Sequence, residues 1–156
     1  MNQHLYSFLI SFTLFIFLLD RRKIHINIYG GIIGAVYQLI QNLIAHYLNL
    51  WKYNNVSLFL PNSALFSETI NIFTVGYAFT MGCLFLQFLP RNIYLQLFHT
   101  LLWGLFYYLS RYIMHKFSVI TYIHFSVHFS MNILTFLFSL VWFNNTFLRC
   151  YKPKDI

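Results

Sequence analysis

The stretch TINIFTVGYAFTMGCLFLQFL, residues 69–89, decides how this chain folds. Its 21 residues carry no charge, Glu68 stands directly before it, and Pro90 and Arg91 follow it. An α-helix of that length is roughly 30 Å long, about the thickness of the hydrocarbon core of a bilayer. The stretch therefore predicts a transmembrane helix, with an acid at its positive end and a proline that stops it.

The composition of the 156-residue chain extends that interpretation to the whole protein. Hydrophobic residues make up 59% of the chain and charged residues only 8%, whereas a soluble domain has about 25% charged residues. A soluble chain this apolar would lack the polar side chains needed to cover its core. The length allows one integral membrane domain, residues 1–156, with no separate soluble domain.

Four further apolar stretches complete the prediction of an all-α, polytopic membrane helix bundle with five transmembrane helices. The predicted spans are residues 5–19, 26–48, 69–89, 92–110 and 119–147. Residues 49–68 form the one long predicted loop. Spans two to five each carry a stripe of small or polar residues at helical spacing among Leu, Ile and Phe, and in lipid such a stripe faces protein.

One such stripe runs along the whole second span. On a helical wheel, small and polar residues share a face about 100° wide. They are Asn27, Gly31, Ala35, Gln38, Asn42, His46 and Asn49. Gly30 and Gly34 are spaced as GxxxG, and Gly31 and Ala35 repeat that spacing. Because glycine and alanine have little or no side chain, these four positions predict a face on which another helix packs closely.

The charges between the spans predict the orientation in a cell membrane. An odd number of spans places the termini on opposite sides, with seven cations on the C-terminal side and three on the other. The seven are Arg21, Arg22, Lys23, Arg91, Arg149, Lys152 and Lys154, and the three are Lys52, Arg111 and Lys116. The N-terminus is therefore predicted outside and the C-terminus in the cytoplasm. Because the cations lie between apolar spans, the net charge of +7 indicates contact with lipid headgroups and no nucleic-acid partner.

This orientation predicts a cluster of ionisable residues at the outer face, called here the outer cluster. Its members are His46, Glu68, Arg111, His115, His124 and His128. Ionisable groups within a membrane protein are costly and tend to mark function.

Three interpretations of the outer cluster compete. In the structural one, Glu68 pairs with Arg111 or with a histidine. In the second, His124 and His128, at i and i+4, present two imidazoles to a zinc or copper ion, and His46 or Glu68 completes the site. In the third, the same residues form a pathway for protons or a binding site for a small ligand.

The sequence contains no residue set that indicates catalysis, since it lacks a Gly-rich phosphate loop, a Ser-His-Asp set and a CxxC pair. A haem b held by His128 and either His46 or His99 is disfavoured, because His99 lies nearer the cytoplasmic half. The leading prediction is a small structural or accessory protein, not an enzyme and without a cofactor, that packs against itself or another membrane protein in the lipid bilayer. The alternative is a membrane-embedded unit that binds or transports a metal ion, protons or a small ligand, and an intramembrane enzyme ranks third.

Residues 38–91 carry a resemblance to known proteins. A polar, glycine-containing span leads into HYLNLWKY, residues 46–53, and a loop with a proline follows. Glu68 then stands just before the next span, which ends in FLPR, residues 88–91. In these features the chain resembles a group of small, uncharacterised multi-pass membrane proteins of spore-forming Gram-positive bacteria. The resemblance implies a location in the bacterial cell membrane and no particular activity.

Overall fold

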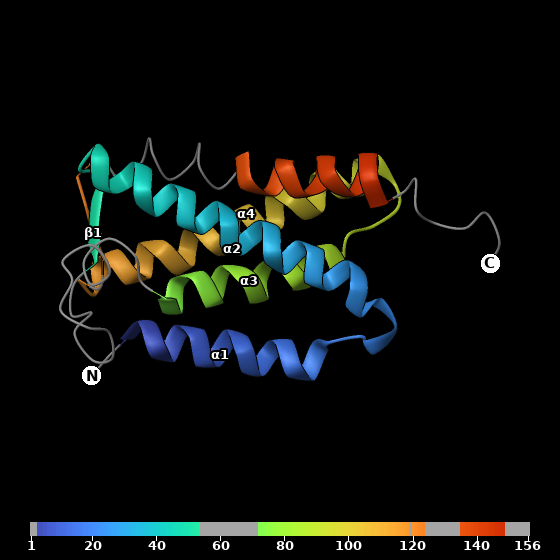
Figure 1. Ribbon diagram of the computed structural model, residues 1–156, viewed down its shortest axis with the longest axis horizontal. Coiled ribbons are helices and arrows are strands. Elements are labelled where there is room, and N and C mark those ends of the chain that lie inside the picture. The colour runs from blue at the N-terminus through green and yellow to red at the C-terminus, as the bar shows by residue number, and fades with distance from the viewer. Residues whose placement is uncertain (1–2, 54–71, 119, 124–134, 149–156) are drawn as a thin grey trace.

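Residues 3–53, 72–118, 120–123 and 135–148 are described in the computed structural model of the chain, and most of them are helical (Figure 1). The elements in chain order are α1 (Gln3–Leu18), the 3₁₀ turn η1 (Arg21–Lys23), α2 (Ile24–Tyr47), β1 (Trp51–Tyr53), α3 (Ile72–Gln87), α4 (Ile93–Lys116), β2 (Ile120–Tyr122) and the C-terminal helix, residues 135–148, which ends in the π-helical segment η3 (Asn144–Leu148). The all-α class is confirmed.

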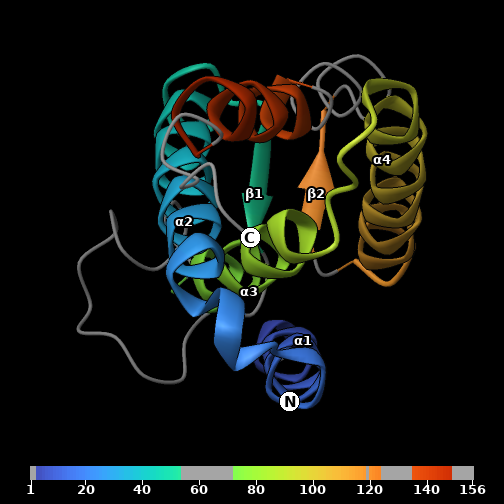
Figure 2. The ribbon, with the colours of Figure 1, turned by 90° about the vertical axis from the view of Figure 1, so that its right-hand side faces the viewer.

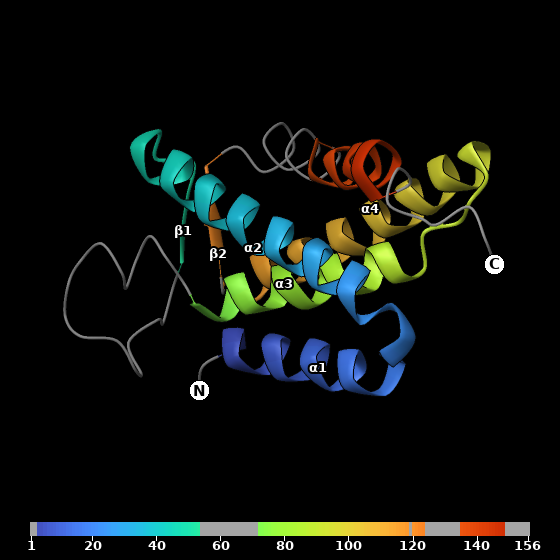
Figure 3. The ribbon, with the colours of Figure 1, turned by 45° about the vertical axis from the view of Figure 1, so that its right-hand side comes forward.

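The helices run alternately in opposite directions along one axis (Figures 1 and 3). We name the two ends of this bundle by what lies there: the η1 end holds the turn η1, and the ribbon end holds β1 and β2. Seen along the axis, α3 lies in the middle, with α1, α2 and α4 on three sides and the C-terminal helix on the fourth (Figure 2). The start of α1 and the end of the C-terminal helix lie at opposite ends (Figure 3).

The first two helices match the predicted spans closely: α1 and α2 begin and end within two residues of residues 5–19 and 26–48. The prediction for the fourth span, residues 92–110, is wrong at its end, since α4 continues to Lys116. It ended the helix before Arg111, taking that cation as a stop signal. Arg111 is buried within the bundle instead, and the helix continues beyond this residue.

The prediction for the fifth span, residues 119–147, is wrong at its start. Ile120–Tyr122 forms the strand β2, which pairs antiparallel with Trp51–Tyr53 inside the predicted loop. Strand β1 holds two aromatic residues, and β2 holds Tyr122 beside the β-branched Ile120 and Thr121; aromatic and β-branched residues favour extended backbone. The remainder of that span is helical over residues 135–148, and residues 124–134 lie outside the described residues.

The same device turns the chain from α2 into β1 and from α4 into β2. Asn49 has φ 51° and Ser118 has φ 55°, so each is a left-handed residue two positions after the last residue of its helix. After α2 the turn is closed by a hydrogen bond from the Leu50 N–H to the Ala45 carbonyl at 2.9 Å. Left-handed residues commonly end helices in this way. The ends of α2 and α4 are thereby joined through the two-stranded ribbon.

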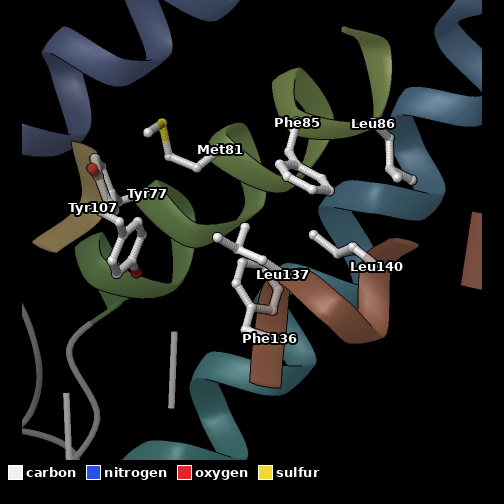
Figure 4. Packing of buried hydrophobic residues seen from close by; sticks show 8 residues of the cluster. All are labelled: Tyr77, Met81, Phe85, Leu86, Tyr107, Phe136, Leu137 and Leu140. Carbon is white, nitrogen blue, oxygen red and sulfur yellow. The ribbon is translucent and has the colours of Figure 1, made fainter. Parts of the chain in front are cut away.

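Helix α3, which lies within the apolar stretch of residues 69–89, forms the centre of the fold. Within the part of α3 from residue 77 to residue 87, every side chain except that of Phe79 is buried. A hydrophobic core joins α3 to α4 and the C-terminal helix (Figure 4). Its members are Tyr77, Met81, Phe85, Leu86, Tyr107, Phe136, Leu137 and Leu140. The apolar stretch thus forms the element against which the others pack.

Helices α2 and α3 cross with their backbones in contact. A Cβ atom added at Gly30 would overlap the carbonyl oxygen of Gly82, and one added at Gly34 would overlap the carbonyl oxygen of Ala78. Glycine is required at these two positions of α2 because backbone atoms occupy the space that a side chain would take.

The glycines of the small-residue face predicted for α2 thus lie against α3. At Gly31 an added Cβ would lie 2.6 Å from both the Cys83 Sγ and the Phe79 ring, and Ala35 is half-buried. The matching face on α3 is formed by Ala78 and Gly82, which repeat the same four-residue spacing.

Candidate functional site

Polar side chains are buried in the bundle beside its hydrophobic core, and many large apolar side chains are exposed. The buried polar side chains are Ser11, Asn27, Gln38, Asn42, Thr74, Thr80, Gln87, Gln96, Thr100 and Arg111. Exposed Leu, Ile, Phe and Tyr side chains cover the outward faces of α1, α2 and α4. Several groups able to do chemistry, Arg111 among them, therefore lie inside the bundle.

Arg111 is the one buried ionised side chain among the described residues, with 5% of its surface exposed. Its Nη2 donates to the Gln38 Oε1 at 3.2 Å and to the Tyr107 Oη at 3.1 Å. The guanidinium carbon lies 5.3 Å from the centre of the Tyr107 ring, within the range of a cation–π contact. The Gln38 Nε2 in turn donates to the Asn42 Oδ1 at 2.9 Å. We call these four residues the Arg111 cluster.

Helical spacing accounts for the Arg111 cluster. Gln38 and Asn42 are one turn apart on α2, Tyr107 and Arg111 are one turn apart on α4, and i, i+4 side chains are neighbours on a helix. The primary amide of Gln38 accepts from the guanidinium and donates to Asn42, so it links the two helices. These hydrogen bonds offset part of the cost of burying a charge.

Two other members of the outer cluster lie toward the ribbon end. His115 is half-buried, its Nδ1 lies 3.2 Å from the Ile120 carbonyl oxygen, and its ring meets that of Tyr122 edge-on. His46 is exposed near the end of α2 and its ring lies edge-on to Tyr47. Arg111 and His115 therefore lie one turn apart on α4. His46 lies near the end of α2, the helix that the ribbon joins to α4.

The remaining members, Glu68, His124 and His128, lie outside the described residues, so the zinc or copper site stays a prediction. The described ranges hold no group of three His, Cys, Asp or Glu side chains arranged to hold a metal ion. His99, the other histidine considered for haem, lies in the half of α4 nearer the η1 end. Its Nε2 is 3.2 Å from the Phe85 carbonyl oxygen.

A second polar junction lies at the η1 end and centres on Gln87, the last residue of α3. Its Oε1 accepts from the Asp20 backbone N–H at 3.0 Å and from the Asn27 Nδ2 at 2.8 Å. Its Nε2 donates to the Leu18 carbonyl oxygen at 2.5 Å. One side chain thus holds the end of α1, the start of α2 and the end of α3 together.

A third junction joins the start of α4 to the C-terminal helix. The Asn145 Nδ2 donates to the Gln96 Oε1 at 2.9 Å, and the Gln96 Nε2 donates to the Pro90 carbonyl oxygen at 2.9 Å. The helical wheel places Gln96 on the inward stripe of its span, and Gln87 on that of span three. The hydrogen-bond partners of Gln96 and Gln87 were missed, because a helical wheel describes one helix and these partners belong to other elements.

We expect Arg111→Met to lower the free energy of unfolding by about 1–2 kcal/mol, because the change leaves acceptors on Gln38 and Tyr107 without their donor. Denaturant unfolding in detergent measures the change. The exposed Lys116→Met, at the end of the same helix, should stay within about 0.5 kcal/mol of the parent protein. The double variant Gln38→Leu/Arg111→Met should lose clearly less than the sum of the two single changes. Strict additivity would contradict the coupling described here.

Of the described helices, α2 holds the one stretch, Asn27–Tyr47, that is both long and apolar enough to cross a membrane. Leu5–Leu18 and Ile72–Gln87 are shorter apolar helices. Both the length of α2 and its apolar composition thus fit a helix that could cross a membrane.

Comparison of the chain with protein families, with curated proteins and with solved structures finds no match. The resemblance to small multi-pass membrane proteins of spore-forming bacteria stays a prediction from the sequence.

Proposed function

We propose that this chain is an integral membrane protein of the cell membrane, a five-span helix bundle with the N-terminus outside and the C-terminus in the cytoplasm. Its role is that of a small structural or accessory protein that packs against itself or against another membrane protein. The observation that carries the proposal is the apolar exterior of a bundle whose interior holds buried polar side chains as well as a hydrophobic core. Soluble monomers rarely expose contiguous apolar patches beyond a few hundred Å², whereas here the exposed apolar side chains run along three helices.

The helix lengths support this proposal. Helices α2 and α4 have 24 residues each, so each is roughly 36 Å long, which is enough length to cross a hydrocarbon core of about 30 Å with some tilt. Helix α1 has 16 residues, and a bilayer accommodates a short helix by thinning locally at a modest cost. Helix α3, described over 16 residues, is surrounded by protein. Lipid therefore meets mainly α1, α2 and α4.

The use of the buried polar groups favours a structural role over catalysis. The Arg111 cluster, Gln87 and Gln96 each make hydrogen bonds that join one helix to another element. Such interhelical hydrogen bonds help to hold membrane helices together where lipid supplies no hydrophobic driving force between them.

The second candidate is a membrane-embedded unit that binds or transports a metal ion, protons or a small ligand. It is favoured by the burial of Arg111, because an ionisable side chain within a membrane bundle is a functional-site hypothesis by default. The Arg111→Met comparison separates the two: a structural cluster loses stability in that variant, whereas a cluster kept for a ligand leaves the stability of the protein unchanged.

The orientation is tested by reporter fusions. A reporter active only in the cytoplasm, fused after Ile156, should be active, and a reporter active only outside should be inactive at that position. Fused after Tyr53, which lies in β1 at the ribbon end, the two reporters should exchange their behaviour.

Fractionation supplies the control for these fusions. The parent protein should stay in the membrane pellet through a carbonate wash, as an integral protein does. Release into the supernatant would overturn the membrane assignment, and outside activity at Ile156 would overturn the orientation alone.

A further inference from the structure

Three cations occupy a single turn at the η1 end. Arg21, Arg22 and Lys23 form the 3₁₀ turn between α1 and α2, and all three are exposed. The Asp20 carboxylate accepts a hydrogen bond from the Arg22 backbone N–H at 2.9 Å, so this acid caps the turn. The turn therefore presents three positive side chains to its surroundings on a fixed backbone.

A fourth cation lies at the same end of the bundle. Arg91 is exposed in the connection between α3 and α4, and α3 ends there at Gln87. Because Gln87 is hydrogen bonded to Asp20 and Leu18, the two connections are held side by side. We call Arg21, Arg22, Lys23 and Arg91 the basic rim.

The basic rim borders the apolar exterior directly. On the α1 side stands Phe17, which is 82% exposed, and on the α4 side stand Ile93 and Tyr94, with Tyr94 80% exposed. On α2 the exposed side chain of Ile24 follows the turn at once. Positive side chains next to exposed apolar ones match a layer in which phosphates adjoin acyl chains.

We propose that the basic rim binds the headgroup phosphates of anionic phospholipids. This inference rests on the proposed membrane location. The guanidinium groups pair with phosphate oxygens, and the neighbouring apolar side chains meet the acyl chains of the same lipid. The exposed apolar border favours a lipid over a soluble phosphate compound, because a soluble compound has no apolar part for these side chains to contact.

The test is lipid-dependent stabilisation of the purified full-length protein. The thermal midpoint in detergent is followed while phosphatidylglycerol or phosphatidylcholine is added. Phosphatidylglycerol should raise the midpoint at lower lipid concentration than phosphatidylcholine does, and 0.5 M salt should remove most of that preference by screening exposed charges.

Two double variants with the same change of charge locate the effect. Arg21→Gln/Lys23→Gln alters the basic rim, and Lys52→Gln/Lys116→Gln alters the ribbon end. One cation near an anionic surface is worth about a fivefold change in binding. The rim variant should therefore need at least about fivefold more phosphatidylglycerol for half of the effect, and the ribbon-end variant should stay within about twofold of the parent protein.

Two results would overturn the inference. An equal shift in both double variants would show a general effect of net charge, and equal stabilisation by inorganic phosphate without lipid would show a site for a soluble anion. Failure of the membrane assignment is recognised separately, because it appears as release in the carbonate wash. A protein that stays in the membrane while its rim variant keeps the full lipid preference contradicts only the inference about the basic rim.

Discussion

Gly82→Ala is expected to lower the free energy of unfolding by about 2–3 kcal/mol, as overpacking of a close contact does. The new methyl group would overlap the carbonyl of Gly30, which belongs to the backbone of α2 and cannot rotate away. The two helices would have to separate along their whole crossing. In a bilayer the loss is felt fully, because close contact between helices is an attraction that lipid does not replace.

Gly76→Ala in the same helix is the matched control. There the added methyl group would lie 2.6 Å from the ring of Phe8, a side chain that can turn aside. Alanine also improves helix propensity equally in both variants. The Gly76 variant should therefore stay within about 1 kcal/mol of the parent protein in detergent unfolding. Equal midpoints for the two variants would remove the backbone contact as a source of stability.

Gln87→Met is expected to cost about 2–3 kcal/mol, since methionine fills a similar volume and makes none of the hydrogen bonds. The change would leave the buried Asn27 amide and the Leu18 carbonyl without their partner. The connection that holds Arg21–Lys23 should loosen as well. Trypsin, which cleaves after Arg and Lys, should therefore cut the variant in this turn faster than the parent protein.

The outward Ile32→Met is the control for that experiment, because Ile32 is exposed on α2 and takes no part in the hydrogen bonds of Gln87. It should change the stability by less than about 0.5 kcal/mol and leave the cleavage rate as it is. Unchanged cleavage in the Gln87 variant would mean that the η1 turn is held by other contacts.

The face of α2 could be predicted from the sequence because that helix has two different sides. Asn27, Gln38 and Asn42 are buried, as the helical wheel predicts, while Ile32 and Ile40 on other sides are exposed. A stripe that includes Gln87 was predicted for span three, but helix α3 is buried on nearly all sides, so that stripe covers only part of its packing surface. Ala78 and Gly82 were therefore missed, although their spacing matches that of Gly30 and Gly34.

The end of α4 and the ribbon could not be predicted because both depend on distant partners. A cation marks the end of a span when no polar group inside the bundle can bind it. Arg111 is instead hydrogen bonded to Gln38, which belongs to a helix far earlier in the chain. Each strand is three residues long, and the helices α3 and α4 separate the two strands in the sequence. Neither short strand carries a pattern that marks it in isolation.

The candidate site was predicted in part for the same reason. The outer cluster grouped Arg111 with His115, and both lie toward the ribbon end of α4, since their positions follow from the spacing along one helix. The hydrogen bonds to Gln38 and Tyr107 decide what Arg111 does, and they follow only from the packing of α4 against α2.

In the proposed membrane location, the ribbon also sets the height of the protein in the bilayer. Its outer edges carry backbone N–H and C=O groups that hydrocarbon does not tolerate without partners. In the proposed orientation the ribbon is therefore confined to the headgroup layer, and through Asn49 and Ser118 it holds the ends of α2 and α4 at that level. These two helices cannot slide along the membrane normal. A change in bilayer thickness must then be taken up at the opposite, η1 end, where Gln87 ties α1 to α2 and α3.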